Sequence, residues 1–298
     1  MINKCVNNCL QRRTYININR MKSFTDYKDN ILSFQHDIRR MATEMAKSAG
    51  KAGSHIGGSF SCIEIFSVLY GGIMDYDVNN PTWDERDRFI PSKTHCILSN
   101  FSTLVKAGFI TKDKLLSFHD DGGLLAGHPW NVEIGLEFAG GSLGMGIGVA
   151  VGMALVAKRY GKKHKVYVLL GDGESNEGSV WEAFMSASKF KLDNLVVIID
   201  YDNMQFDGPN DEVMSLAPLK EKMLAFGFET LEVDGHDIKA LWDAFSTRHD
   251  GKPLAIIAKT IKAHGIPSLE NTAESHHAEL SEEDYQFLLT QFAEEDKA

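Results

Sequence analysis

The stretch VYVLLGDGESNEGSVWEAF, residues 166–184, decides the fold of this chain. An apolar run ends on the triplet Gly171-Asp172-Gly173, and a helical pattern follows from Glu177. A second apolar run, LVVIID (195–200), leads into Asn203. Two buried strands joined by a helix form a βαβ unit, whose strands lie parallel. The stretch therefore predicts a parallel sheet with polar residues at the carboxyl ends of two strands.

The remaining chain continues this alternation. Four strand-like runs are apolar at nearly every position, as strands buried on both faces must be: KVYVLL (165–170), NLVVIID (194–200), FETLEV (228–233) and PLAIIAK (253–259). Helical patterns cover 26–49, 144–160, 177–190, 216–227, 237–248 and 281–292. We expect an α/β fold that is doubly wound, with a mostly parallel sheet and helices on both faces, formed by one domain over residues 22–298.

Composition narrows the classes of function. The chain has 298 residues and a net charge of −10, and an acidic chain without a basic stripe is a poor candidate for binding nucleic acid or an anionic membrane. No apolar run reaches the ~20 residues needed to span a bilayer. The four cysteines lack the spacing of a zinc site, which favours free thiols and a cytoplasmic location. Residues 1–21 lack the apolar core of a secretory signal, and we expect them to form a poorly ordered extension.

Asp172 and Asn203 follow two strands that we expect to be neighbours. Ligands of doubly wound sheets bind at the carboxyl ends of the strands, so these side chains should meet there. A carboxylate and an amide oxygen suit a hard cation whose other ligands are phosphate oxygens, and glycines let the backbone approach a phosphate. A lone Gly-Asp-Gly is a common turn, and this one is neither a Walker loop nor a G-x-G-x-x-G fingerprint. The prediction of a cation–diphosphate site rests on the order of the elements, which is a strand, Gly-Asp-Gly, a helix, a second strand and then Asn203.

This pattern, with 29 residues between Gly173 and Asn203, is similar to the thiamine-diphosphate motif, and GDGESNEGSVWEA resembles that of the transketolases. Five further segments resemble the family's in the same order: AGSHIGGSFSCIEIFSVLY (52–70), RDRFIPSKTHC (86–96), LAGHPW (125–130), GLEFAGGSLGMGIGVAVGMAL (135–155) and KTIKAHGIPSLENTAESHH (259–277). The resemblance covers nearly all of residues 30–280. Transketolases continue with a pyrimidine-binding and a C-terminal domain. The resemblance thus implies the N-terminal subunit of a split transketolase, joined to a pyrimidine-domain partner in an α2β2 heterotetramer.

The resemblance also implies the reaction and its cofactors. A transketolase transfers a two-carbon ketol unit from a ketose donor, often a phosphate, to an aldose acceptor, with thiamine diphosphate and Mg²⁺, for which Ca²⁺ or Mn²⁺ can substitute. By the same resemblance, Asp172, Asn203 and the main-chain oxygen of Gln205 ligate the metal. Cofactor contacts are assigned to Gly141, Leu143, Gly171, Asp172, Gly173, Glu174, Glu177, Asn203, His95 and His276.

Four histidines fall on the segments that hold the sugar in the family. They are His55, His95, His128 and His276, and the resemblance implies catalytic roles for them. Histidine suits this work because its ordinary pKa of about 6.5 lets it donate and accept protons near neutral pH. His277 competes with its neighbour His276 for the same position in the family pattern.

Departures from the family pattern gather near the expected substrate channel. Thr94 replaces a glycine, Pro91 an aliphatic residue, Trp130 a smaller residue and Met145 a polar one. They favour a donor or acceptor outside the common pentose phosphate pair. Two alternatives share much of the pattern: the α subunit of a 2-oxo acid dehydrogenase, and a non-catalytic regulatory half. The His55 and His128 segments argue against the first, and the intact Asp172/Asn203 pair argues against the second.

Overall fold

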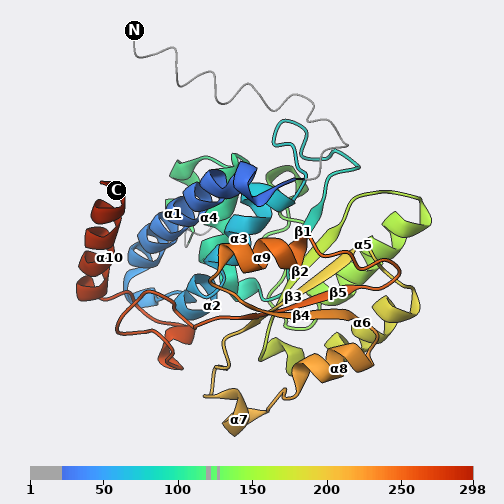
Figure 1. Ribbon diagram of the computed structural model, residues 1–298. Helices are drawn as coiled ribbons and strands as arrows, with labels where there is room; N and C mark the ends of the chain where they lie inside the picture. The colour runs from blue at the N-terminus through green and yellow to red at the C-terminus, as the bar shows by residue number, and fades with distance from the viewer. Residues whose placement is uncertain (1–21, 119–121, 126–127, 298) are drawn as a thin grey trace.

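The computed structural model describes residues 22–118, 122–125 and 128–297 (Figure 1). The expected extension, residues 1–21, lies outside this part of the chain. At its centre is a five-stranded sheet of order β1-β2-β3-β5-β4, in which all neighbouring strands are parallel. The strands are β1 (Arg88–Pro91), β2 (Val166–Gly171), β3 (Leu195–Tyr201), β4 (Glu229–Asp234) and β5 (Leu254–Lys259). The expected α/β fold with a parallel sheet is confirmed.

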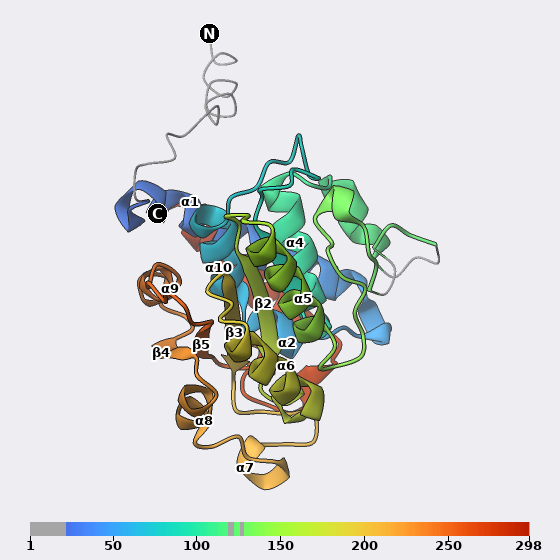
Figure 2. The same cartoon turned by 90° about the vertical axis from the view of Figure 1, so that its right-hand side faces the viewer.

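Helices cover both faces of the sheet (Figures 1 and 2). One face packs against α1 (Phe24–Ser48), α2 (Ile56–Phe60), α3 (Ile63–Val68), α4 (Ile97–Ala107) and α9 (Ile238–Phe245), with α10 (Glu282–Glu295) outside α1. The other face packs against α5 (Gly146–Arg159), α6 (Gly178–Lys189) and α8 (Leu219–Ala225), while the short α7 (Asn210–Val213) follows β3. Within the described ranges, no helix is long and apolar enough to cross a membrane.

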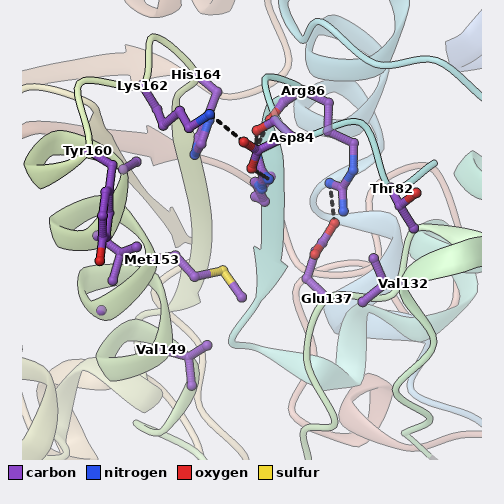
Figure 3. A pocket seen from close by; sticks show the side chains of 14 residues that line it. Thr82, Asp84, Arg86, Val132, Glu137, Val149, Met153, Tyr160, Lys162 and His164 are labelled. Carbon is purple, nitrogen blue, oxygen red and sulfur yellow. Dashed lines mark hydrogen bonds and ion pairs between the residues drawn. The ribbon is translucent and has the colours of Figure 1, made fainter. Parts of the chain in front are cut away.

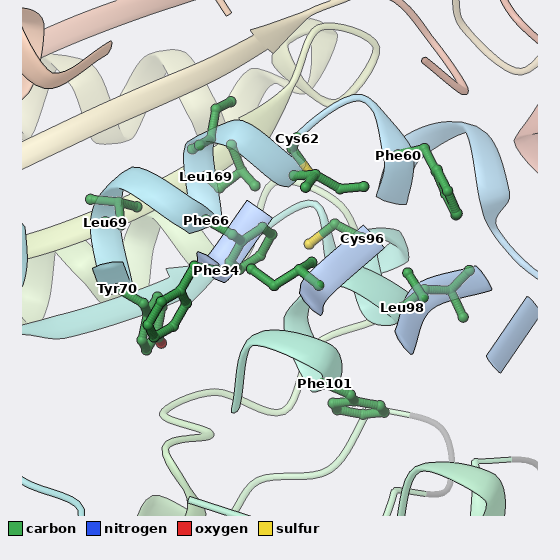
Figure 4. Close-up of a cluster of buried hydrophobic side chains, with 14 of the residues drawn as sticks. Phe34, Phe60, Cys62, Phe66, Leu69, Tyr70, Cys96, Leu98, Phe101 and Leu169 are labelled. Atoms are coloured by element: carbon green, nitrogen blue, oxygen red, sulfur yellow. The ribbon is translucent and has the colours of Figure 1, made fainter. Parts of the chain in front are cut away.

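Alternate residues of each central strand enter different apolar clusters. In β2, Val166, Val168 and Leu170 pack with α5 and α6, whereas Tyr167 and Leu169 pack with the cluster of α1, α3 and α4. Successive side chains of a strand point to opposite faces, so burial on both faces requires an unbroken apolar run. Figure 4 shows part of the larger cluster, which also contains the free thiols of Cys62 and Cys96.

The two edge strands differ from the sequence prediction. FETLEV was expected to be buried on both faces, but β4 pairs only with β5; Thr230 is its one buried residue, and Leu231 and Val233 are partly buried and alternate with exposed acids. This prediction was wrong because an edge strand needs one apolar face only. The opposite edge, β1, was not recognised as a strand, since it has four residues behind a polar segment. It ends on Pro91, a residue that sheets accept at an edge.

Because every strand is parallel, the loops that follow them gather at one edge of the sheet. One of these loops is tied to the helical layer through Glu64 in α3, which is 1% exposed. Its Oε1 accepts hydrogen bonds from Gln35 Nε2 at 2.8 Å and Arg39 Nη2 at 3.1 Å, and its Oε2 lies 3.0 Å from His236 Nδ1. Burial raises the pKa of Glu64, but His236 and Arg39 outweigh this and lower it to about 2. We call Gln35, Arg39, Glu64 and His236 the Glu64 cluster.

Glu64→Gln should remove a pH-dependent part of the stability. The pKa of Glu64 is lower in the folded state than in the unfolded chain, so its contribution is present above pH ~4.5 and is lost as the pH falls towards ~2. The difference in free energy of unfolding between the wild type and Glu64→Gln should shrink by about 3 kcal/mol over that range. Urea titrations between pH 2.5 and 7 measure it. The exposed Glu221→Gln is the control, and a difference independent of pH would contradict the prediction.

Candidate functional site

The Asp172 carboxylate joins the loops that follow β2 and β3. Its Oδ1 accepts a hydrogen bond from the Gly173 amide at 2.7 Å. Its Oδ2 accepts from the Asn203 amide and from Asn210 Nδ2, both at 2.8 Å. Burial raises the pKa of Asp172, although the hydrogen bond from Asn210 opposes the shift. The two strand ends therefore meet, as the sequence predicts, with Asn203 held through its main chain.

Asp202 is a functional candidate that the sequence analysis did not assign. It is 8% exposed, and its Oδ1 accepts a hydrogen bond from the Met204 amide at 2.9 Å. Burial and the negative charge of Asp172 raise the pKa of Asp202 to about 8. The neighbouring Asn203 has a left-handed φ of 61° and is exposed. The signal available in the sequence was an acidic residue directly after a buried strand.

Gln205 and Gly173 lie against each other across the turn. A Cβ placed on Gly173 would lie 3.3 Å from Gln205 Cγ, so a larger residue here would press on that side chain. The Gln205 amide donates to Gly208 O at 2.8 Å, and its Nε2 donates to Met214 O at 3.2 Å. Gln205 is thus fixed at both ends beside the Gly-Asp-Gly turn.

Glu174 holds three segments together beneath the site. Its buried carboxylate accepts hydrogen bonds from Ser92 Oγ, from the Gly144 amide at 2.9 Å and from the Gly171 amide at 3.1 Å. A Cβ on Gly146 would lie 2.8 Å from Ser92 Cα, so only glycine lets α5 begin so close to the end of β1. Glu174 therefore sets the position of residues 135–155, which we call the glycine-rich segment.

The glycine-rich segment presents Gly141 and Leu143 to solvent. Gly141 has a φ of 119°, and its amide donates to Thr94 Oγ1 at 3.1 Å. Thr94 does not adopt a left-handed conformation, so its replacement of the family's glycine costs no backbone strain. Leu143 is exposed, and so is Glu177, which occupies the N-cap position of α6.

The four predicted histidines gather above this edge, with His277 in addition. The ring centroid of His55 lies 5.9 Å from that of His95, 5.6 Å from that of His276 and 4.9 Å from that of His277. The rings of His95 and His276 are 5.1 Å apart. His128 lies beside Gly141, whose Cβ, if it had one, would be 3.3 Å from the imidazole. Segments far apart in the sequence thus form one imidazole cluster.

Burial and neighbouring positive charges lower the pKa values of four of these imidazoles, those of His55, His95, His128 and His276, and so keep them neutral. Burial, His277 and His128 lower the pKa of His55 to about 4, and burial and Lys262 lower that of His276 to about 3. Burial and the charge of Lys93 lower the pKa of His95, and burial lowers that of His128. A neutral imidazole carries one donor and one acceptor, which is what a sugar hydroxyl requires from a partner. The cluster can therefore bind hydroxyl groups and move protons at neutral pH.

Two buried lysines lie beneath the cluster, and the sequence analysis missed both. Lys93 forms an ion pair with Asp200, which also accepts a hydrogen bond from Ser61 Oγ at 2.6 Å. Lys262 is 3% exposed and donates to Met204 O at 2.7 Å. Among the described residues, no carboxylate forms an ion pair with Lys262. Its charge acts on Asp172 and Asp202, where it opposes the rise in pKa that burial causes, and it can also attract an anion at this position.

A large cavity lies elsewhere. It has a volume of about 720 Å³ and opens beside the amino ends of β1 and β2, between α5 and residues 82–88 (Figure 3). Its lining includes the ion pairs Arg86–Glu137 and Lys162–Asp84. The histidine cluster instead follows the carboxyl ends of the strands. The candidate site is therefore a half-exposed surface of this chain. In the described ranges, no group of three or more His, Cys, Asp or Glu side chains could by itself hold a metal ion.

The sequence of this chain is similar to those of known proteins. Residues 33–297 match the family described as "Transketolase, thiamine diphosphate binding domain". The chain is 38% identical over 258 residues to an apulose-4-phosphate transketolase subunit from Phocaeicola vulgatus, covering 86% of this chain and 91% of that protein. It is 35% identical over 268 residues to the 6-deoxy-6-sulfo-D-fructose transketolase subunit SqwG of a Clostridium species, covering 89% and 98%.

The fold has a counterpart among solved structures. A transketolase from Campylobacter jejuni superposes with a TM-score of 0.83 at 32% identity. The match covers 88% of this chain and 43% of that one. The chain thus spans less than half the length of this solved relative.

Proposed function

Because the chain belongs to the transketolase family, we propose that it is the N-terminal, cofactor-binding subunit of a two-chain transketolase. The enzyme would move a two-carbon ketol unit from a ketose to an aldose. The observation that carries this proposal is the histidine cluster directly above the Asp172 turn. Relatives of similar length are named as subunits, so a pyrimidine-domain chain is the expected partner, in an α2β2 heterotetramer. We place this enzyme in the cytoplasm.

The residues at the strand ends fit thiamine diphosphate and a divalent cation. Asp172 and Asp202 are buried acids whose pKa values are raised, and a cation would stabilise their charged forms. Lys262 lacks an ion-pair partner, and His276 Nδ1 is buried without a hydrogen bond among the described residues, so phosphate oxygens would satisfy both. Gly171 and Gly173 would let a phosphate approach the turn, because neither carries a side chain.

The cation would be Mg²⁺, with Ca²⁺ or Mn²⁺ as substitutes. Asp172 and the main-chain oxygen of Gln205 are proposed ligands, together with one side chain from the end of β3. Both Asn203 and Asp202 are candidates for that place. Burial next to the charge of Asp172 favours Asp202, because Asn203 is exposed.

Bound thiamine diphosphate supplies the carbon nucleophile that takes up the two-carbon unit. This chain's part is to bind, orient and exchange protons. His55, His95, His128 and His276, with His277, would bind the sugar hydroxyls and the reacting oxygen, because each neutral ring can donate and accept. Gly141 and Leu143 would pack against the aminopyrimidine. Glu177, exposed before α6, would face the partner chain, and Glu174 would hold this scaffold in place.

The donor is proposed to be a sugar other than the common pentose phosphates. Trp130 and Met145 are 65% and 56% exposed on the side of the glycine-rich segment and of His128. Two relatives carry the names of apulose-4-phosphate and 6-deoxy-6-sulfo-D-fructose transketolases. Bulky apolar side chains in these positions favour a substrate that differs in shape from xylulose 5-phosphate. A wide preference for xylulose 5-phosphate in steady-state assays would refute this proposal.

Co-expression with a pyrimidine-domain chain tests the function. The mixture should transfer a ketol unit when thiamine diphosphate and Mg²⁺ are present, and the purified chain alone should be silent. Removal of the metal with EDTA should abolish transfer, and Mg²⁺ should restore it. Transfer by the chain alone would contradict the two-chain proposal. Decarboxylation of 2-oxo acids by the mixture would support the dehydrogenase alternative, and stimulation of a complete enzyme without any turnover would support a regulatory half.

A further inference from the structure

His236 connects the Glu64 cluster to the loop that follows β5. Its Nδ1 faces Glu64 at 3.0 Å, and its Nε2 accepts a hydrogen bond from the Ile261 amide at 2.9 Å. Because Nε2 accepts, the proton of the neutral ring is assigned to Nδ1, where it is donated to Glu64. The carboxylate therefore orients the imidazole, and the imidazole holds a main-chain amide.

A second contact of the Glu64 cluster holds the same loop. The His236 ring lies 3.9 Å from the ring of His264, with an angle of 32° between them. Arg39 Nη1 donates to His264 O at 2.8 Å. A Cβ on Gly265 would lie 2.8 Å from this guanidinium nitrogen, so the loop passes very close to Arg39. The main chain of residues 261–265 is thus fixed on both sides of Lys262.

The loop of residues 261–265 contacts both ends of the candidate site. Lys262 reaches the carbonyl of Met204, in the loop that carries Asp202. The Ala263 amide donates to Gly57 O at 3.1 Å, two residues after His55. A Cβ on Gly57 would lie 2.9 Å from Lys262 Cγ and 2.7 Å from Ser275 Oγ, so these three residues pack without spare room. A shift of residues 261–263 would therefore displace Lys262, His55 and the residue beside His276.

We propose that His236 is a positioning residue of this enzyme: through its hydrogen bond to Ile261 it sets where the Lys262 ammonium meets the diphosphate of the cofactor. His236 lies outside the histidine cluster, and its action passes through the main chain of the loop. Its effect on cofactor binding rests on the proposed function. The hydrogen bond from Ile261 to His236 does not rest on that function. The hydrogen bond and the effect on cofactor binding can therefore be measured separately.

The first measurement is amide hydrogen exchange of the chain itself, without partner or cofactor. Loss of the hydrogen bond in His236→Ala should speed exchange of the Ile261 amide by about tenfold. His236→Gln places an acceptor near the same position and should restore slow exchange. The control is His249→Ala, since His249 is a buried histidine that donates to Lys252 O at 2.9 Å near the amino end of β5, away from the site. Unchanged exchange in His236→Ala would overturn the proposal.

The second measurement is the thiamine diphosphate concentration that gives half-maximal transfer in the assembled two-chain enzyme. It should rise roughly tenfold in His236→Ala, with a smaller fall in kcat because the shift also reaches Gly57 near His55, and both should recover in His236→Gln. In a Lys262→Met background the same change should have little further effect, because the positioned group is gone. The proposal is overturned if exchange rises without this shift, or if His249→Ala produces the same shift. Absence of transfer in the unmodified assembly would refute the proposed function, and the exchange result would still decide whether His236 holds the loop.

Discussion

Replacing Asp172 with asparagine is expected to lower cofactor-dependent transfer roughly a thousandfold at millimolar Mg²⁺, because a negatively charged ligand contributes several kcal/mol to holding a cation–diphosphate pair. Asparagine keeps one acceptor oxygen, which can still accept from the Asn203 amide and Asn210 Nδ2, so only the hydrogen bond from the Gly173 amide is lost and the fold should persist. Thermal unfolding of the free variant should occur at the wild-type temperature or above it, since burial raises the pKa of this acid and so disfavours its charge. Steady-state rates and melting curves with and without cofactor measure both effects.

Asp211→Asn is the control, because Asp211 is an exposed acid in the first turn of the nearby α7. Thiamine diphosphate and Mg²⁺ should raise the melting temperature of the assembled wild type and of this control, as any ligand of the native state does. They should not raise that of Asp172→Asn. A variant that keeps both the cofactor-induced shift and a rate within tenfold of the wild type would remove Asp172 from the metal site.

A direct measurement of metal binding distinguishes Asn203 from Asp202, the two candidate ligands at the end of β3. Asn203→Ala should leave Mn²⁺ affinity, measured by electron paramagnetic resonance with thiamine diphosphate present, within a factor of about three. Asp202→Ala should weaken it by roughly 10- to 100-fold, because a buried carboxylate next to Asp172 would be lost. If Asn203→Ala weakened Mn²⁺ binding more than Asp202→Ala did, the ligand would be Asn203, as the resemblance to the family motif implies.

His55→Ala should lower kcat by about 10²- to 10⁴-fold and leave the half-saturating cofactor concentration near that of the wild type. His55 has the most central place in the imidazole cluster, with three other rings within 5.9 Å of its own. Its loss would remove a donor and acceptor that the sugar and the neighbouring imidazoles share. Rates measured at saturating thiamine diphosphate separate this effect from cofactor binding.

His164→Ala is the matched control, since His164 is buried and its pKa is also lowered by burial, but it lines the cavity at the opposite edge of the sheet. The His164→Ala variant should keep the kcat of the wild type. Equal losses of kcat in His55→Ala and His164→Ala would indicate general destabilisation, and a His55→Ala enzyme with wild-type kcat would take His55 out of the catalytic group.

The parallel sheet and the place of the site could be predicted from the sequence because their signals are local. The runs that became β2, β3 and β5 are apolar at nearly every position, and the helices show their own period. A glycine–aspartate turn after a buried strand must lie at the carboxyl edge of a parallel sheet, whatever surrounds it. The histidine segments resemble those of the family closely enough for the resemblance to imply His55, His95, His128 and His276 as candidates, and their catalytic roles stay predictions.

Only the tertiary structure decided which polar groups are buried and what they meet. Asp202 and Asn203 are adjacent in sequence, yet one is buried beside Asp172 and the other is exposed. Nothing local distinguishes Lys262 from a surface lysine, and Glu64 and His236, which are 172 positions apart, meet because α3 and the loop after β4 pack together. Burial and long-range charge pairs depend on how separate elements pack. The spacing of apolar residues in strands and helices, in contrast, depends only on residues close together in the sequence.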